Sequence, residues 1–544
     1  MPDTSSQPKE SGDALPKEWQ KWKAPALNVD DDSPPPSISD RAFLDFTPAP
    51  LDAVAPVWEF PTSDDGRATF FLQHFGGIVR YVPELKLWRV WHGHRWHDDF
   101  TGRLGHYCQI LSRWELLAAE KLLEEMSTAL AETAKATVKA TAKKEKKKAD
   151  DEDDELSPKG IQKRYQWARR QAEALGDEKT ISALLAAAAR IGKIIVPLQQ
   201  WDANPLLVGT LNGVLNLKTS KHRDGGRLDY ITKEIAVQFD AAAQCPHWRK
   251  FIARILPIEL AKYVQRLAGY SLTGGTDDQA FYFLYGVGKN GKSVFIRALA
   301  ALFHHYAGKA PAEMIEEPRN GAPCKHNLAQ LPGIRFLYGE ETTEGGKLRE
   351  NLIKSLTAGD PITGEAKYAA PFIFSPVAKL WLMGNHRPRV HGTDAGIWRR
   401  VRLIPFTECI TEDEDIPASV LLSRFEDERP GILNWMLEGL TANKPGAVPM
   451  PQVVKAAVAE YRESEDDLAE FITDCTQDAA ENYREPKGTV FQAYRKWAAQ
   501  NGITFPLNAK QFTRRVGERE GWKLDAGRRH WMQKSIVGDY LPNS

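Results

Sequence analysis

The chain has 544 residues but only five cysteines, and no two of these cysteines form a CxxC pair. This spacing indicates neither a zinc ribbon nor a disulfide framework, and reduced thiols fit a cytosolic compartment. Net charge is also absent, because 72 basic residues balance 72 acidic ones. A neutral chain does not have the overall charge of a nucleic-acid binder, so any basic surface must be local.

The sequence also lacks an N-terminal signal peptide and any apolar run of membrane-spanning length. Its first 57 residues are instead rich in Pro, Ser and Asp and have little periodic apolar content, which predicts disorder over 1–57. We therefore expect a cytoplasmic protein without a membrane partner, ordered from about Trp58 onward.

Residues 58–275 are predicted to form an α+β and then helical domain. Alternating apolar residues over 70–82, 87–91 and 94–98 predict short strands. Four histidines nearby suggest a metal site, but no cysteine or acid completes a ligand set, and a hairpin with aromatic cross-strand pairs is the alternative that we favour. These histidines are His92, His94, His97 and His106.

Helical periodicity follows over 108–200, interrupted near 134–157 by adjacent basic and acidic runs that indicate a low-complexity linker. Residues 206–219 predict two strands joined by a turn at Asn212-Gly213. Two apolar-periodic helices are then expected over 247–256 and 261–274.

The strongest motif is a glycine-rich loop between a predicted strand, 281–285, and a predicted helix. The loop has the pattern GxxxxGKS, in which backbone N–H groups and the helix N-terminus face phosphate groups. Lys292 is expected to reach the β- and γ-phosphates of ATP, and the Ser293 hydroxyl to bind Mg²⁺. The predicted nucleotide-binding residues are Gly286, Gly288, Lys289, Asn290, Gly291, Lys292 and Ser293.

Polar side chains follow two further predicted strands. Glu340 and Glu341 end the strand 335–338, and at the carboxyl edge of a parallel sheet they would lie over the nucleotide. Glu340 is assigned to Mg²⁺ and Glu341 to the base that polarises the attacking water. Asn385 ends the strand 379–384 and is predicted to orient water against the γ-phosphate, although an Asn before His-Arg-Pro is also typical of a turn.

Two arginines, Arg399 and Arg400, precede a predicted strand over 401–406. An arginine at this position can project toward the ATP of a neighbouring subunit, with Arg400 as the first candidate and Arg399 as the second. The alternative is a surface salt bridge.

The ordered set of motifs resembles the superfamily 3 helicase domain, and specifically the phage, plasmid and poxvirus-type primase–helicases. The resemblance rests on FLYGVGKNGKS, GEETTEGGKLRENLIKSLTAGDPIT and KLWLMGNHRPRVHGTDAGIWRRVRLIPF, with NGVLNLKT, CPHWRKFI and YVQRLAGYSLTG upstream. It implies an AAA-like ATPase that assembles as a homohexameric ring and moves on single-stranded DNA. Origin duplex DNA and a separate primase are further candidate partners, and the host cytoplasm is the expected location if a phage encodes the chain.

Many relatives carry a primase module before the helical domain. Here only about 60 disorder-like residues precede it, which is too few for a polymerase fold, so we do not expect primer synthesis. The resulting fold class is α/β, with a P-loop AAA-like core over 276–445, a helical connector over 446–483 and a winged-helix-like domain over 484–544.

Candidate DNA contacts lie in two places. A hairpin expected within 361–376 carries Lys367 and Tyr368 near its turn, where ring helicases of this type present a hairpin to the pore. The segment 484–544 has twelve Lys/Arg against five Asp/Glu, a local charge of +7. Its second predicted helix carries Lys510, Arg514 and Arg515, which would contact duplex DNA. Protein docking by this domain is the alternative.

Two other functions compete with that of a DNA helicase. A P-loop kinase-like enzyme would need a small-molecule pocket and a lid but no arginine acting across subunits. A replication initiator could bind DNA and use ATP only for assembly, without processive unwinding. DNA-stimulated turnover of ATP distinguishes the helicase from both.

Overall fold

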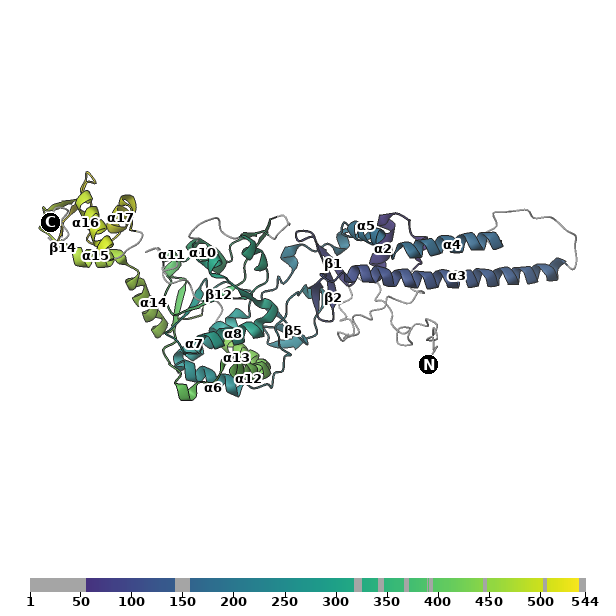
Figure 1. Ribbon diagram of the computed structural model, residues 1–544, viewed down its shortest axis with the longest axis horizontal. Coiled ribbons are helices and arrows are strands. Elements are labelled where there is room, and N and C mark those ends of the chain that lie inside the picture. The colour runs from purple at the N-terminus through teal and green to yellow at the C-terminus, as the bar shows by residue number, and fades with distance from the viewer. Residues whose placement is uncertain are drawn as a thin grey trace, which may run out of the picture.

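The structure is a computed structural model that describes residues 55–141, 157–317, 325–340, 347–365, 371–388, 390, 395–443, 448–501 and 506–537. Figure 1 shows a central body, a small C-terminal unit joined to it by helix α14 (Gln452–Ser464), and a long helical pair on the opposite side. Most of the predicted disordered segment 1–57 lies outside the described residues, as does 142–156 of the expected linker. Within the described residues, none of the helices combines the length and apolar character needed to span a bilayer.

The N-terminal part begins with helix α2 (Asp64–Phe75) and a three-stranded antiparallel sheet, β1 (Val79–Val82), β2 (Leu87–His92) and β3 (Arg95–Asp98). The strand expected over 70–82 is therefore wrong in its first half. Ser63 caps the helix by accepting a hydrogen bond from the Gly66 N–H at 3.2 Å, and Phe70 and Phe71 are both buried, which a half-exposed strand would not allow.

The hairpin β2–β3 pairs Trp91 with Trp96, whose ring centroids lie 5.5 Å apart. This confirms the aromatic cross-strand alternative. In the described part of the chain, no group of three or more His, Cys, Asp or Glu side chains is placed to hold a metal ion. His94 instead lies 2.6 Å from the buried carboxylate of Glu234.

Helices α3 (Arg103–Thr141) and α4 (Pro158–Ala174) form the long antiparallel pair, and α5 (Glu178–Ala188) packs against α2. Helix α3 continues to Thr141, so the first part of the linker expected near 134–157 is helical. The predicted hairpin follows as β4 (Leu207–Thr210) and β5 (Gly213–Asn216), with β6 (Lys221–Arg223) beside it. Its turn is at Leu211-Asn212, one residue earlier than predicted.

The central sheet has five parallel strands in the order β13-β7-β12-β9-β8. Strands β7, β12 and β13 are almost fully buried, as expected for a parallel sheet covered on both faces. Tyr282 and Leu284 of β7 face one apolar cluster, shared with helices α6, α7, α8 and α13, whereas Phe281 and Phe283 face another. The bounds of the strands are β7 Phe281–Tyr285, β8 Ala307–Lys309, β9 Phe336–Glu340, β12 Lys379–Gly384 and β13 Val401–Pro405.

The helices of this body include the two that were predicted upstream of the sheet, α6 (Pro246–Ile255) and α7 (Ile258–Ser271). They share one apolar cluster with the sheet, so residues 246–271 are packed into the central body. The other helices are α8 Lys292–Phe303, α9 Ala312–Ile315, α10 Glu350–Ala358, α11 Ala395–Trp398, α12 Ala418–Asp427 and α13 Arg429–Thr441. Short 3-10 helices lie at Val57–Glu59, Gly192–Ile194, Leu198–Gln200, Arg227–Asp229, His304–Tyr306, Lys325–Gln330 and Glu412–Glu414.

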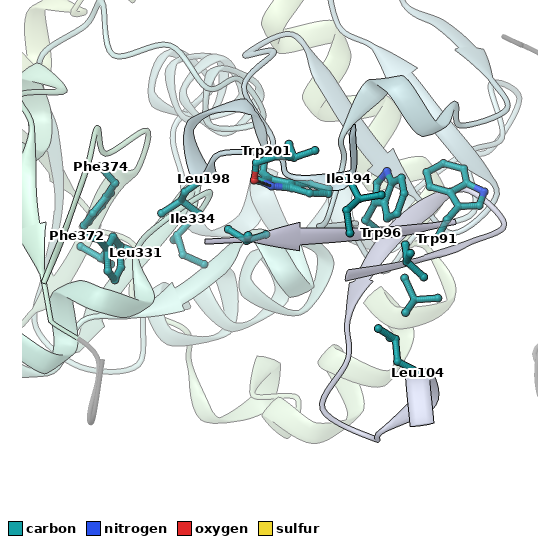
Figure 2. Packing of buried hydrophobic residues seen from close by; sticks show 14 of the residues in the cluster. Trp91, Trp96, Leu104, Ile194, Leu198, Trp201, Leu331, Ile334, Phe372 and Phe374 are labelled. Atoms are coloured by element: carbon teal, nitrogen blue, oxygen red, sulfur yellow. Dashed lines mark hydrogen bonds between the residues drawn. The ribbon is translucent and has the colours of Figure 1, made fainter. Parts of the chain in front are cut away.

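A second apolar cluster joins the N-terminal part to the central body. Figure 2 shows it running from Trp91 and Trp96 past Trp201 and Ile334 to Phe372. Phe372 belongs to the expected hairpin, which is formed by β10 (Ile362–Gly364) and β11 (Phe372–Phe374). The N-terminal sheet and this hairpin are thus parts of one packed structure.

The C-terminal unit contains α15 (Asp467–Cys475), α16 (Lys487–Gln500) and α17 (Ala509–Gly517) around its own apolar core. Helix α15 contributes Phe471 to that core, so the unit starts upstream of residue 484. Its strands pair antiparallel as β14 (Thr476–Asp478) with β17 (Lys534–Ile536) and β15 (Arg484–Pro486) with β16 (His530–Met532). The two strands expected near the C-terminus therefore pair with strands on the N-terminal side of α16.

Candidate functional site

The glycine-rich loop leaves the end of β7 and enters α8, as the sequence predicts. Two of its positions require glycine, one because the chain passes close to it and the other because of its backbone conformation. A Cβ at Gly286 would lie 2.2 Å from the carbonyl oxygen of Phe406, and Gly291 has a φ of +78°. Any side chain at either position would displace or strain the loop.

Lys292 is the first residue of α8, where the loop ends, and it is buried, with 6% of its surface exposed. Its Nζ donates to the Gly286 carbonyl oxygen at 2.6 Å, to Asn290 Oδ1 at 2.9 Å and to Asn385 Oδ1 at 3.4 Å. A buried ammonium requires such acceptors, because removing the charge from water is costly. The structure thus brings together the loop lysine and the asparagine that follows β12, which are 93 residues apart in sequence.

Asn290, Lys292 and Asn385 line a cavity of about 650 Å³, and Gly286 does not. Glu340 enters from the end of β9 and Asn385 from the end of β12, so both lie at the carboxyl edge of the sheet, beside the loop. Glu340 is half-exposed, and its Oε2 accepts from Lys309 Nζ at 3.0 Å. The Ser293 side chain also borders the cavity, whereas Glu341 lies outside the described residues.

The other side of the cavity was not anticipated from the sequence. It is formed by Phe251 of α6 and by residues of the chain that follows β13, namely Ile410, Asp415, Ile416, Ala418 and Leu421. The regular apolar spacing of α6 indicates a core helix, and Phe251 does pack in the core, so no sequence signal marks its second role.

Comparison with known proteins places Phe251 and the glycine-rich loop in two different family segments, and the lining residues from Ile410 to Leu421 follow both segments. Residues 68–257 match the family described as "D5 N terminal like", and residues 284–400 match a "Family of unknown function (DUF5906)". The chain is 25% identical over 346 residues to "Putative helicase L207/L206" of Acanthamoeba polyphaga mimivirus, covering 59% of this chain and 36% of that protein. It is 25% identical over 218 residues to "Putative primase C962R" of African swine fever virus, covering 38% of this chain and 22% of that protein.

Over these two segments the chain resembles the D5-like primase–helicases. This confirms the resemblance inferred from the sequence motifs. The chain matches 36% and 22% of the length of these two relatives. A solved structure described as "The A form apo structure of NrS-1 C terminal region-CTR" aligns with a TM-score of 0.42 and 9% identity, covering 85% of this chain and 97% of that chain.

The two candidate arginines have different environments. Arg400 is buried, and its Nε donates to Thr357 Oγ1 at 3.1 Å while an Nη donates to the Gly396 carbonyl oxygen at 2.5 Å. Arg399 is exposed. Both precede β13 and lie at the amino edge of the sheet, whereas the cavity lies at the carboxyl edge. Of the two, Arg399 is therefore the arginine accessible to a neighbouring molecule.

The same edge of the sheet holds a buried ion pair. Asp278 accepts from Arg402 at 3.3 Å and from the Tyr282 hydroxyl at 3.1 Å. Burial raises the pKa of Asp278 above its usual value, and the positive charge of Arg402 opposes that shift. This network fixes the start of β13 and β7, and so it supports the position of the adjacent arginines.

The candidate DNA-contacting residues are only partly within the described chain. The β10–β11 hairpin is confirmed, but Lys367 and Tyr368 at its turn lie outside the described residues. On α17, Lys510 and Arg514 are exposed and Arg515 is half-buried. Arg514 Nε lies 3.9 Å from a carboxylate oxygen of Glu518, which directly follows the helix, so this ion pair is a distant one.

Proposed function

We propose that the chain is an ATP-hydrolysing replicative DNA helicase that works as a hexameric ring on single-stranded DNA. The observation that carries the proposal is the position of Lys292, whose ammonium lies between the glycine-rich loop and Asn385 at the border of one cavity. A lysine ammonium at this position can form hydrogen bonds to the β- and γ-phosphates of a bound nucleotide. The helicase and primase relatives support action on nucleic acid.

Each polar residue has a separate role in the proposed hydrolysis. The Asn385 amide would orient the attacking water against the γ-phosphate, and Glu341 would act as its general base. Ser293 and Glu340 supply the hard oxygen ligands that Mg²⁺ prefers, and both line the cavity. When bound there, the ion would neutralise negative charge on the phosphates. Arg399 would complete the site of an adjacent subunit, because its own cavity lies at the opposite edge of the sheet.

DNA contact is assigned to two surfaces. The β10–β11 hairpin, with Lys367 and Tyr368 at its turn, would grip single-stranded DNA in the pore. The C-terminal unit, which we interpret as a winged helix, would contact origin duplex DNA through Lys510, Arg514 and Arg515 on α17. A separate primase remains a candidate partner.

The test is ATP turnover by the purified chain with and without single-stranded DNA. We expect DNA-stimulated hydrolysis and nucleotide-dependent assembly, both measured on the same preparation. Lys262→Ala, an exposed substitution on α7, serves as the control variant for Lys292→Ala. Turnover that DNA does not change would instead favour a small-molecule kinase, and nucleotide-dependent assembly without turnover would favour an initiator.

A further inference from the structure

The cavity has two chemically different sides, and the order of the strands separates them. Glu340 and Asn385 follow β9 and β12, which lie on one side of β7. The segment that contributes Ile410, Ile416 and Leu421 follows β13, which lies on the other side of β7. The glycine-rich loop, which follows β7 itself, lies between the polar side and the apolar side.

The apolar side has both a rigid part and an accessible part. Phe251 is buried, with ring contacts to Trp248 and Phe425, and its Cζ lies 3.2 Å from the position that a Cβ at Gly291 would take. Helix α6 therefore packs directly on the glycine-rich loop. Ile416, by contrast, is 39% exposed and lines the cavity, so its side chain is accessible to a ligand.

Residues 409–416, which we name the clasp, are fixed to both neighbouring elements. The Ile410 N–H donates to the Lys289 carbonyl oxygen at 2.8 Å, so the clasp adds a backbone hydrogen bond to the glycine-rich loop. Arg254 of α6 donates to the Cys409 carbonyl oxygen at 2.7 Å and, through Nε, to Glu414 at 3.2 Å. Helix α6, the loop and the clasp thus hold one another at a defined separation.

We propose that the apolar side, formed by Phe251, Ile416 and Leu421, binds the base of a purine nucleotide whose triphosphate occupies the glycine-rich loop. This inference rests on the proposed function, because it assigns the remaining half of the same cavity. A triphosphate belongs with Lys292 on the polar side, and the cavity of about 650 Å³ is of the size that encloses a small ligand. The faces of a planar base are apolar, and they gain contact with apolar side chains when they leave water.

The same geometry predicts that the cavity binds both adenine and guanine nucleotides. Asp415 is the charged side chain that the clasp contributes to the cavity, but it is about half exposed and lies 3.8 Å from Lys289 Nζ. A solvated carboxylate that is already paired gives little discrimination between the edges of adenine and guanine. Selection is therefore by apolar area, which is greater for a purine than for a pyrimidine.

The experiment compares whole nucleotides with their phosphate chain alone. Binding of the non-hydrolysable imido analogues of ATP, GTP and CTP, and of tripolyphosphate, is measured by calorimetry on the full chain and on the variants Ile416→Ala and Leu421→Ala. Each variant is expected to weaken both purine analogues by about tenfold, because the shorter side chain covers less of the base, and to leave tripolyphosphate unchanged. The control is Val420→Ala, because Val420 is 40% exposed on the same helix as Leu421 but does not line the cavity.

The possible outcomes distinguish failure of the base site from failure of the whole nucleotide site. Unchanged affinity for the ATP analogue in both variants, or equal weakening of the ATP analogue and tripolyphosphate, would overturn the base site while leaving a nucleotide site at the loop. A CTP analogue that binds as tightly as the purine analogues would also overturn it. If the unaltered protein binds neither the nucleotides nor tripolyphosphate, the proposed function itself fails, and the inference fails with it.

Discussion

Asn385 Oδ1 lies 3.4 Å from Lys292 Nζ, which joins the end of β12 to the glycine-rich loop that follows β7. The amide therefore has a fixed position relative to the loop lysine. Helix α8 begins at Lys292, so this pair also connects the helix to two neighbouring strands.

The first prediction concerns Lys292. Lys292→Ala is expected to reduce ATP turnover to background, because the β- and γ-phosphates lose their charged partner. Steady-state phosphate release measures the effect, and a melting curve establishes that the variant is folded. Near-normal turnover in a folded Lys292→Ala variant would rule out this loop as the phosphate site.

The second prediction separates binding from chemistry. Glu341→Gln and Asn385→Ala should each retain ATP binding but lower kcat on the order of 10²-fold, because they act on the attacking water. Equilibrium binding and single-turnover hydrolysis provide the two readouts. If Glu340→Gln abolishes turnover whereas Glu341→Gln is mild, the roles of the two acids are reversed.

The third prediction distinguishes the two arginines. Arg400→Ala should lower the free energy of unfolding by roughly 1–3 kcal/mol, because it removes the donor to Thr357 in a buried site. Arg399→Ala should leave the melting temperature unchanged but lose ATP turnover. Thermal denaturation and phosphate release of both variants test this pair of expectations.

A mixing experiment then tests whether Arg399 acts across subunits. Lys292→Ala keeps its arginine and Arg399→Ala keeps its pocket, so mixed assemblies contain some interfaces in which both are intact. The mixture should recover turnover that neither variant has alone. No recovery, with mixed oligomers demonstrated by tagged pull-down, would refute a role between subunits.

The fourth prediction concerns the C-terminal unit. The double variant Lys510→Ala and Arg514→Ala should weaken duplex binding and flatten its salt dependence by a slope of about 2, because two phosphate contacts release their counterions. The matched control is Lys163→Ala with Lys179→Ala, two exposed lysines on α4 and α5. An unchanged slope in the α17 variant would assign this unit to protein docking.

The fifth prediction follows from Glu115 of α3. Burial raises its pKa from the usual 4.5 to about 7, although the Val57 N–H, which donates to Oε2 at 2.8 Å, favours the charged form. The folded state then binds the proton more tightly than the unfolded state, so the free energy of unfolding should fall as pH rises from about 4.5 to about 7. Above pH 7 this contribution is constant.

Glu115→Gln should remove that pH dependence and raise stability at pH 8 on the order of 1–3 kcal/mol. Denaturant unfolding between pH 5 and 8 measures it, with Glu120→Gln as an exposed control on the same helix. Parallel pH profiles for the unaltered protein and Glu115→Gln would contradict the expectation.

The central strands and the loop could be predicted because their signals are local. The short apolar run 281–285, followed by a glycine-rich loop, has the pattern of a buried parallel strand. The glycines of the GxxxxGKS pattern allow the backbone conformation of the loop. The error over 70–75 also has a local cause. The apolar residues of the short run FFLQHF fit both the two-residue period of a strand and the 3.6-residue period of a helix. The Ser63 cap and the packing of both faces favour the helix.

The sequence by itself determined the resemblance to primase–helicases, the glycine-rich loop and the polar residues that end neighbouring strands, because each rests on short patterns with a direct chemical meaning. Only the tertiary structure decided which arginine is buried, since Arg399 and Arg400 are adjacent and differ only in the side of the chain from which they project. It also decided that Phe251 and Leu421, 170 positions apart, line one cavity. Such a pairing depends on strand order and helix packing, which bring distant segments together without leaving a pattern in either one.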